Sequence, residues 1–106
     1  DCVFNCGLGS ERSTLTVTFR APAGGGSYEI CGATTNCPGS FTTCHTVAAG
    51  ATRVFTLAGR SACCSGIFCS TDNSDWFFLR VRGLGTPTAW SCQPYRLDYT
   101  GDETCS

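Results

Sequence analysis

The cysteine content of this chain constrains its fold more than any other feature. Ten of its 106 residues are cysteines, a fraction typical of secreted domains that are held together by disulfides. A domain of this length buries only a modest core, so covalent cross-links supply stability that burial alone does not. The chain starts at Asp1 with no apolar leader before Cys2, which fits a mature secreted chain. We therefore expect one extracellular domain spanning residues 1–106.

The cysteine positions argue for disulfides and against a metal site. No two cysteines have the two-residue gap of zinc knuckles and thioredoxin-type redox motifs. We expect all ten to be oxidised within the chain, in five disulfides whose pairing the sequence does not specify. Cys105 is expected to bond to Cys2 or Cys6, because nothing else would hold the polar tail. The predicted disulfide residues are Cys2, Cys6, Cys31, Cys37, Cys44, Cys63, Cys64, Cys69, Cys92 and Cys105.

The charge and hydropathy of the chain argue against several classes of partner. Seven basic and eight acidic residues leave a net charge of −1, so the chain lacks the positive field that nucleic-acid binders carry. No window approaches the roughly 18 apolar residues of a membrane-spanning helix. We expect no nucleic-acid partner, no membrane span, no cofactor and no metal ion.

Short alternating segments predict an all-β fold. In Ser13–Arg20, apolar residues alternate with threonines, which is the period of a strand with one face in a core. Gly59 is expected to end the fourth strand, and Pro94 to bend the last one or place it at an edge. The six strands are predicted at 13–20, 27–31, 41–47, 52–57, 76–82 and 88–99. Such short strands between turns predict a small disulfide-rich antiparallel β-sandwich or barrel.

The same alternation predicts which side chains form the core. Each predicted strand carries its apolar residues at every second position, and these positions would line the inner faces of two sheets. The predicted core residues are Leu15, Val17, Phe19, Val54, Phe77, Leu79, Val81 and Leu97.

The strand predicted at 76–82 provides the candidate binding surface. If its aliphatic positions face the core, the other side presents aromatic rings and arginines, which are enriched at protein interfaces and sugar-stacking platforms. We predict that this stripe binds a protein or glycan partner; it consists of Trp76, Phe78, Arg80 and Arg82. The alternative is that Trp76 and Phe78 are covered by the segment that carries Cys63 and Cys64.

Arg60 is a second candidate binding residue. It precedes Ser61 in a predicted loop close to Cys63, and rigid loops with an exposed arginine are used by secreted inhibitors of trypsin-like proteases. A serine-protease inhibitor is therefore one alternative function, and a secreted toxin, antimicrobial or effector protein is another. A third is a building block of an extracellular fibre or coat. The chain has no lysine, the residue that commonly guards strand edges, so self-association through edge strands is possible.

The titratable residues do not form a recognisable catalytic motif. His45 is the only histidine, and no Gly-x-Ser-x-Gly motif occurs. The acidic clusters Asp72/Asp75 and Asp102/Glu103 are typical of turns. We therefore predict a non-enzymatic recognition protein without hydrolase activity that depends on His45.

Overall fold

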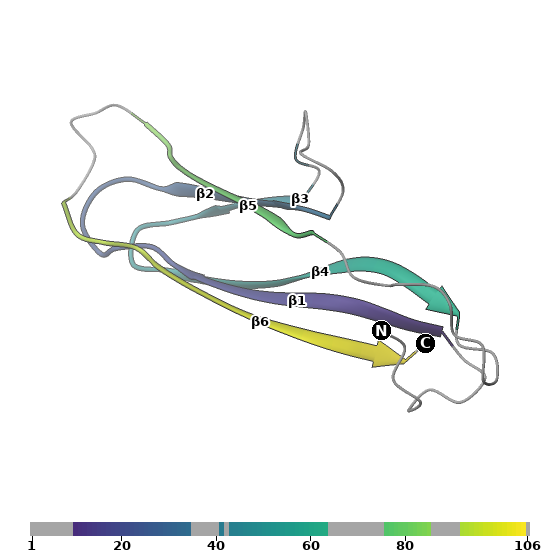
Figure 1. Ribbon diagram of the computed structural model, residues 1–106. Coiled ribbons are helices and arrows are strands. Elements are labelled where there is room, and N and C mark those ends of the chain that lie inside the picture. Colours follow the sequence, from purple (N-terminus) through teal and green to yellow (C-terminus); the bar gives the residue numbers. More distant parts are fainter. Residues whose placement is uncertain (1–9, 35–40, 42, 64–75, 86–91, 106) are drawn as a thin grey trace.

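The computed structural model describes residues 10–34, 41, 43–63, 76–85 and 92–105, and all regular secondary structure in these residues is β-strand. Two antiparallel three-stranded sheets are formed, in the orders β4-β1-β6 and β3-β2-β5 (Figure 1). The predicted all-β class is confirmed. The strands are β1 (Ser10–Arg20), β2 (Tyr28–Ala33), β3 (Thr43–Val47), β4 (Thr52–Cys63), β5 (Phe78–Gly83) and β6 (Arg96–Cys105). Within the described residues there is no helix with the length and apolar character needed to cross a membrane.

The longer sheet is built around β1. This strand pairs with β4 from Ser10↔Cys63 to Arg20↔Thr52. The register shifts between Arg12 and Thr14, so that Gly59 and Arg60 together lie opposite Ser13. The prediction that Gly59 ends the strand is therefore wrong. A glycine inside a strand commonly marks a bulge, and here the chain continues through the bulge to Cys63.

On its other side, β1 pairs with β6 over almost its whole length, from Glu11↔Cys105 to Arg20↔Arg96. The sequence placed the last strand at 88–99 and treated 100–104 as a tail. The structure instead begins the strand at Arg96, after Pro94, and continues it to Cys105. Hydrogen-bonded pairing with β1 thus holds the tail. The predicted bond from Cys105 to Cys2 or Cys6 lies outside the described residues.

Two connections between the sheets, β1–β2 and β3–β4, lie side by side at one end of the molecule (Figure 1). The Ala21 amide donates to the Ala51 carbonyl at 3.0 Å, and the Gly50 amide donates to the Pro22 carbonyl at 2.9 Å. Gly50 has a φ of 73°, a conformation that favours glycine. The β1–β2 and β3–β4 connections are therefore bonded to each other.

Both sheets contribute side chains to one hydrophobic core. The buried members are Leu15, Val17, Phe19, Phe55 and Leu57 from the first sheet, Ile30 and Val47 from the second, and Ala21 between them. The predicted core residues Phe77, Leu79, Val81 and Leu97 are partly buried against this cluster. Val54 was predicted in the core but is 57% exposed. The register explains this correction, because β1 pairs its buried Val17 with Phe55 and its buried Leu15 with Leu57.

A glycine of one sheet lies directly against a core side chain of the other. A Cβ atom added to Gly32 of β2 would lie 2.5 Å from Cδ1 of Leu57 of β4. Any larger residue at Gly32 would displace the Leu57 side chain. The absence of a side chain is therefore part of how β2 packs over β4.

One disulfide lies within the described residues. It joins Cys31 of β2 to Cys44 of β3, and the two residues are direct cross-strand partners. Cys92 is exposed and carries a free thiol in this structure, whereas the sequence predicted that all ten cysteines are bonded. The predicted set of five disulfides is therefore not confirmed.

Candidate functional site

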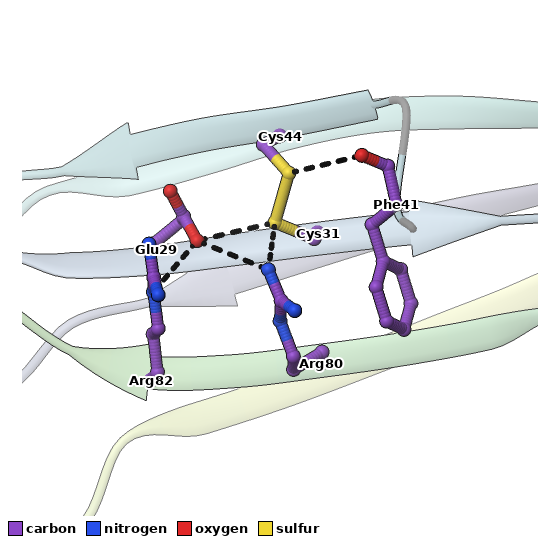
Figure 2. The surroundings of a disulfide bond; sticks show 6 residues. All are labelled: Glu29, Cys31, Phe41, Cys44, Arg80 and Arg82. Atoms are coloured by element: carbon purple, nitrogen blue, oxygen red, sulfur yellow. Dashed lines mark hydrogen bonds and ion pairs between the residues drawn. A yellow bond between two sulfur atoms is a disulfide. The ribbon is translucent and has the colours of Figure 1, made fainter. Parts of the chain in front are cut away.

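A polar cluster occupies the outer side of the sheet β3-β2-β5 (Figure 2). Ile30 of β2 is fully buried in the core, so its neighbours Glu29 and Cys31 point to the opposite side of the sheet. The β2–β5 register places Arg82 opposite Glu29 and Arg80 opposite Cys31. We use the name arginine face for the residues gathered there: Glu29, Phe41, Phe78, Arg80 and Arg82.

The centre of the arginine face is one carboxylate shared by two guanidinium groups. Arg82 Nε lies 2.8 Å from Glu29 Oε1, and Arg80 Nη2 lies 3.4 Å from the same oxygen. The Glu29 side chain is only 18% exposed, whereas the Arg80 and Arg82 side chains are 44% and 58% exposed. The three groups together carry a net charge of +1, and the positive charge lies on the solvent side.

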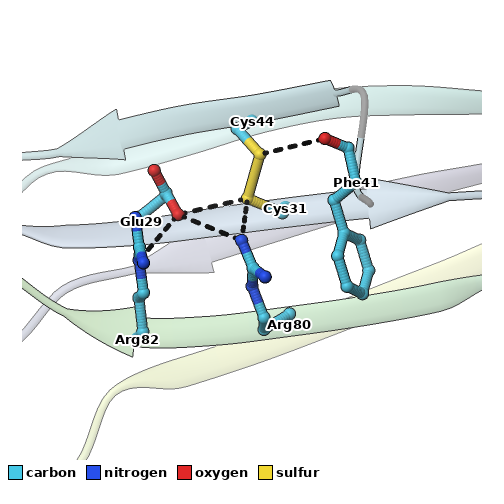
Figure 3. A network of polar contacts seen from close by, with 6 residues as sticks. All are labelled: Glu29, Cys31, Phe41, Cys44, Arg80 and Arg82. Atoms are coloured by element: carbon cyan, nitrogen blue, oxygen red, sulfur yellow. Dashed lines mark hydrogen bonds and ion pairs between the residues drawn. A yellow bond between two sulfur atoms is a disulfide. The ribbon is translucent and has the colours of Figure 1, made fainter. Parts of the chain in front are cut away.

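Arg80 is held by two further contacts (Figure 3). Its Nη2 lies 3.5 Å from Cys31 Sγ, and its Cζ lies 4.6 Å from the centre of the Phe41 ring, a cation–π arrangement. Cys31 is fully buried and fixed to Cys44 by the disulfide. The guanidinium of Arg80 is therefore oriented by a carboxylate, a sulfur atom and an aromatic ring before any partner arrives.

The same cluster brings three potential metal ligands together, but it is not suited to a metal ion. A carboxylate oxygen of Glu29 and the Sγ atoms of Cys31 and Cys44 lie within 4.8 Å of one another. Metal binding by cysteine requires a thiolate, and both sulfur atoms belong to the disulfide. For the same reason Cys31 Sγ has no hydrogen to donate, and its 3.4 Å approach to Glu29 Oε1 is a packing contact.

The predicted division of this strand between two faces is what the structure shows. Phe78, Arg80 and Arg82 lie on the outer side, while Leu79 and Val81 pack against the core. Phe78 is half-buried. Trp76 precedes β5 and is 77% exposed. Residues 64–75, which belong to the segment expected in the alternative to cover Trp76 and Phe78, lie outside the described residues.

Three components of the arginine face are not predicted from the sequence: Glu29, Phe41 and the Cys31–Cys44 pair. No local pattern marks them, because Glu29 and Arg80 are 51 residues apart in the chain.

Arg60 does not belong to this surface. It was predicted in a loop, but it lies inside β4 of the other sheet, at the bulge, because the strand does not end at Gly59. Asp72 and Asp75 lie outside the described residues.

His45 lies on the core side of β3, away from the arginine face. It is half-buried, and its ring centre is 4.7 Å from that of Phe55. Burial lowers the pKa of His45, and the positive charge of Arg53 lowers it further, because both disfavour the charged imidazolium. These surroundings favour the neutral form of the ring, which packs against an aromatic neighbour.

No protein-family model, curated protein or solved structure matches this chain.

Proposed function

We propose that this chain is a secreted, non-enzymatic recognition protein that binds a protein or glycan partner through the arginine face and the neighbouring Trp76. One observation carries the proposal: two exposed guanidinium groups are held on a single carboxylate oxygen of Glu29. They form a preorganised positive site on a rigid sheet. Its chemistry fits a partner that presents carboxylates, as acidic peptides and acidic glycans both do.

The binding energy would come from directional bonds to arginine combined with aromatic contact. A guanidinium has five N–H donors in a planar fork, which match a carboxylate in bidentate geometry. Because Arg80 is already oriented by Glu29 and Phe41, little side-chain freedom is lost when a partner binds. Trp76 offers an exposed ring that can stack on a sugar or an apolar side chain.

The proposed scaffold for this surface is a small β-sandwich stapled by disulfides. The shared core of the two sheets supports this architecture, and the cysteine content supports an oxidising, extracellular location. Five disulfides would require a partner for Cys92 as well. Intact masses before and after reduction count the bridges, at two hydrogens for each.

The test is a binding screen with arrays of acidic and neutral glycans and of acidic and neutral peptides, followed by titration of each acidic binder. We expect binding to acidic members only. Replacing Arg80 or Arg82 with alanine should weaken binding about 30-fold, the equivalent of a central interface residue that contributes about 2 kcal/mol. Trp76→Ala should also weaken binding, and it should melt like the wild type because the ring is exposed.

Arg20→Ala is the matched control, since Arg20 is an exposed arginine on the other sheet. It should bind with unchanged affinity. Full affinity in both Arg80→Ala and Arg82→Ala, or selective binding of neutral ligands, would show that the arginine face is not the binding surface. Unfolding of Trp76→Ala would instead assign that ring a structural role.

A further inference from the structure

Strand β6 is an edge strand with the features of a pairing surface. Among the described strands it has a neighbour, β1, on one side only (Figure 1). Pro94 precedes the strand, and the register shift of this sheet lies in the pairing with β4 on the far side. Neither device that commonly blocks an edge, a proline or a bulge, therefore interrupts β6, and the chain contains no lysine.

The order of charges along β6 favours an antiparallel copy of the same strand. Arg96 lies near its beginning and Asp102 near its end, and both are exposed on the outer side of the sheet. If two β6 strands pair antiparallel about Tyr99, Arg96 of each copy lies directly opposite Asp102 of the other. The symmetry of the pair creates this contact twice. Asp98 then lies opposite Thr100, and its own carboxylate already accepts from Arg96 Nε at 2.8 Å.

Neighbouring registers place like charges opposite each other. A side chain keeps its side of the sheet only if the register changes in steps of two residues. A shift of two residues in one direction places Asp98 opposite Asp98 of the second copy. A shift of two residues in the other direction places Asp98 of each copy opposite Asp102 of the other. Like charges directly opposite one another are destabilising. The charge pattern thus selects the register centred on Tyr99.

The core side of β6 fits the same register. Tyr99 pairs with the fully buried Val17 of β1 but is itself 68% exposed. A Cβ atom added to Gly101 would meet no atom within 4 Å. In the register centred on Tyr99, the two Tyr99 rings meet at the symmetry axis, and Leu97 of each copy lies opposite Gly101 of the other. A large side chain is therefore matched with an open position.

We propose that two copies of this chain associate through antiparallel β6–β6 pairing centred on Tyr99, which joins their sheets β4-β1-β6 into one six-stranded sheet. The pairing covers Arg96 to Asp102 of each copy, a contact about 24 Å long. Such a short contact predicts a reversible dimer. It uses the sheet that does not carry the arginine face, so it is independent of the proposed binding function.

Sedimentation equilibrium over micromolar to millimolar protein, at low salt, tests this pairing. The wild-type mass should rise from 11.2 kDa towards twice that value. Arg96→Asp and Asp102→Arg should each raise the dissociation constant about tenfold, because each places two pairs of like charges opposite one another. Since these variants change the net charge in opposite directions, a general charge effect would not weaken both. The double variant Arg96→Asp/Asp102→Arg should regain dimerisation.

Thr52→Asp is the control, because it adds a charge to the same outer side of the sheet but on β4. It should dimerise like the wild type. Thermal melts verify that all variants are folded. A mass that stays at 11.2 kDa throughout overturns the proposal, and so does a dimer that both single variants leave intact. Growth into species larger than a dimer would show open pairing between different edges and would also overturn it.

Discussion

The close contact between Gly32 and Leu57 predicts that a single methyl group added at position 32 lowers the stability of the fold. The Cβ atom of Gly32→Ala would lie 2.5 Å from Cδ1 and 2.9 Å from Cδ2 of Leu57, well inside van der Waals contact. Leu57 is only 4% exposed and lies between the two sheets, so it must leave its favoured position within a packed core. Overpacking of this kind costs about 1–3 kcal/mol. For a domain of this size, the loss corresponds to a decrease in melting temperature of at least about 4 °C.

Gly101→Ala is a matched control. Gly101 also lies inside a strand, but its added Cβ would meet no atom within 4 Å. The substitution should be neutral or should stabilise the fold by up to about 1 kcal/mol, because alanine restricts the unfolded chain more than glycine does. Both variants are compared with the wild type by urea and thermal denaturation of dilute protein with its disulfides intact.

A double-mutant cycle tests whether Leu57 is the side chain that the added methyl group at position 32 displaces. Leu57→Ala alone should cost about 2–5 kcal/mol through loss of buried volume. In the double variant the alanine at position 32 no longer meets the leucine side chain, so the combined loss should be smaller than the sum by about 1 kcal/mol or more. Equal stability of Gly32→Ala and Gly101→Ala, or simple additivity with Leu57→Ala, would refute the packing of β2 over β4.

Two further predictions concern β4 and its neighbour His45. Val54→Thr should change the free energy of unfolding by no more than about 0.5 kcal/mol because Val54 faces solvent. Phe55→Ala should lower it by about 3–5 kcal/mol. If chemical denaturation showed the larger loss for Val54→Thr, Val54 would lie in the core. The pKa of His45 is lowered in the folded state by burial and by Arg53, so the unfolded state binds the proton more readily. Stability should therefore decrease as pH falls below about 6.5 and through the folded-state pKa. His45→Gln should lose this part of the pH dependence, and identical pH profiles for wild type and variant in thermal melts would contradict the assignment.

Local alternation was sufficient to divide β5 correctly between two faces. Successive side chains of a strand point to opposite sides, whatever the strand pairs with. Once Leu79 and Val81 were assigned to the core, the outward direction of Arg80 and Arg82 followed. Strong alternation likewise predicted the inward side of β1. These features depend on neighbours in the sequence, which is why the sequence alone specifies them.

In β4, local alternation does not select which side chains are buried. Residues 52–57 contain apolar side chains in both phases of the alternation, with Val54 in one and Phe55 and Leu57 in the other. Only pairing with the buried residues of β1 selects the second phase. The bulge that carries the strand past Gly59 also depends on β1, as does the strand formed by the polar residues 100–105.

The cysteine-rich, all-β character of the chain and the two sides of its clearest strands follow from composition and alternation, which are properties of the residues and the local backbone. The contact of Glu29 with Arg80 and Arg82, the exposure of Val54 and the place of Arg60 in a strand arise only when the two sheets assemble. Each of these depends on register between segments distant in the chain. Register is set by the combined burial and hydrogen bonding of whole sheets, and no single segment encodes it.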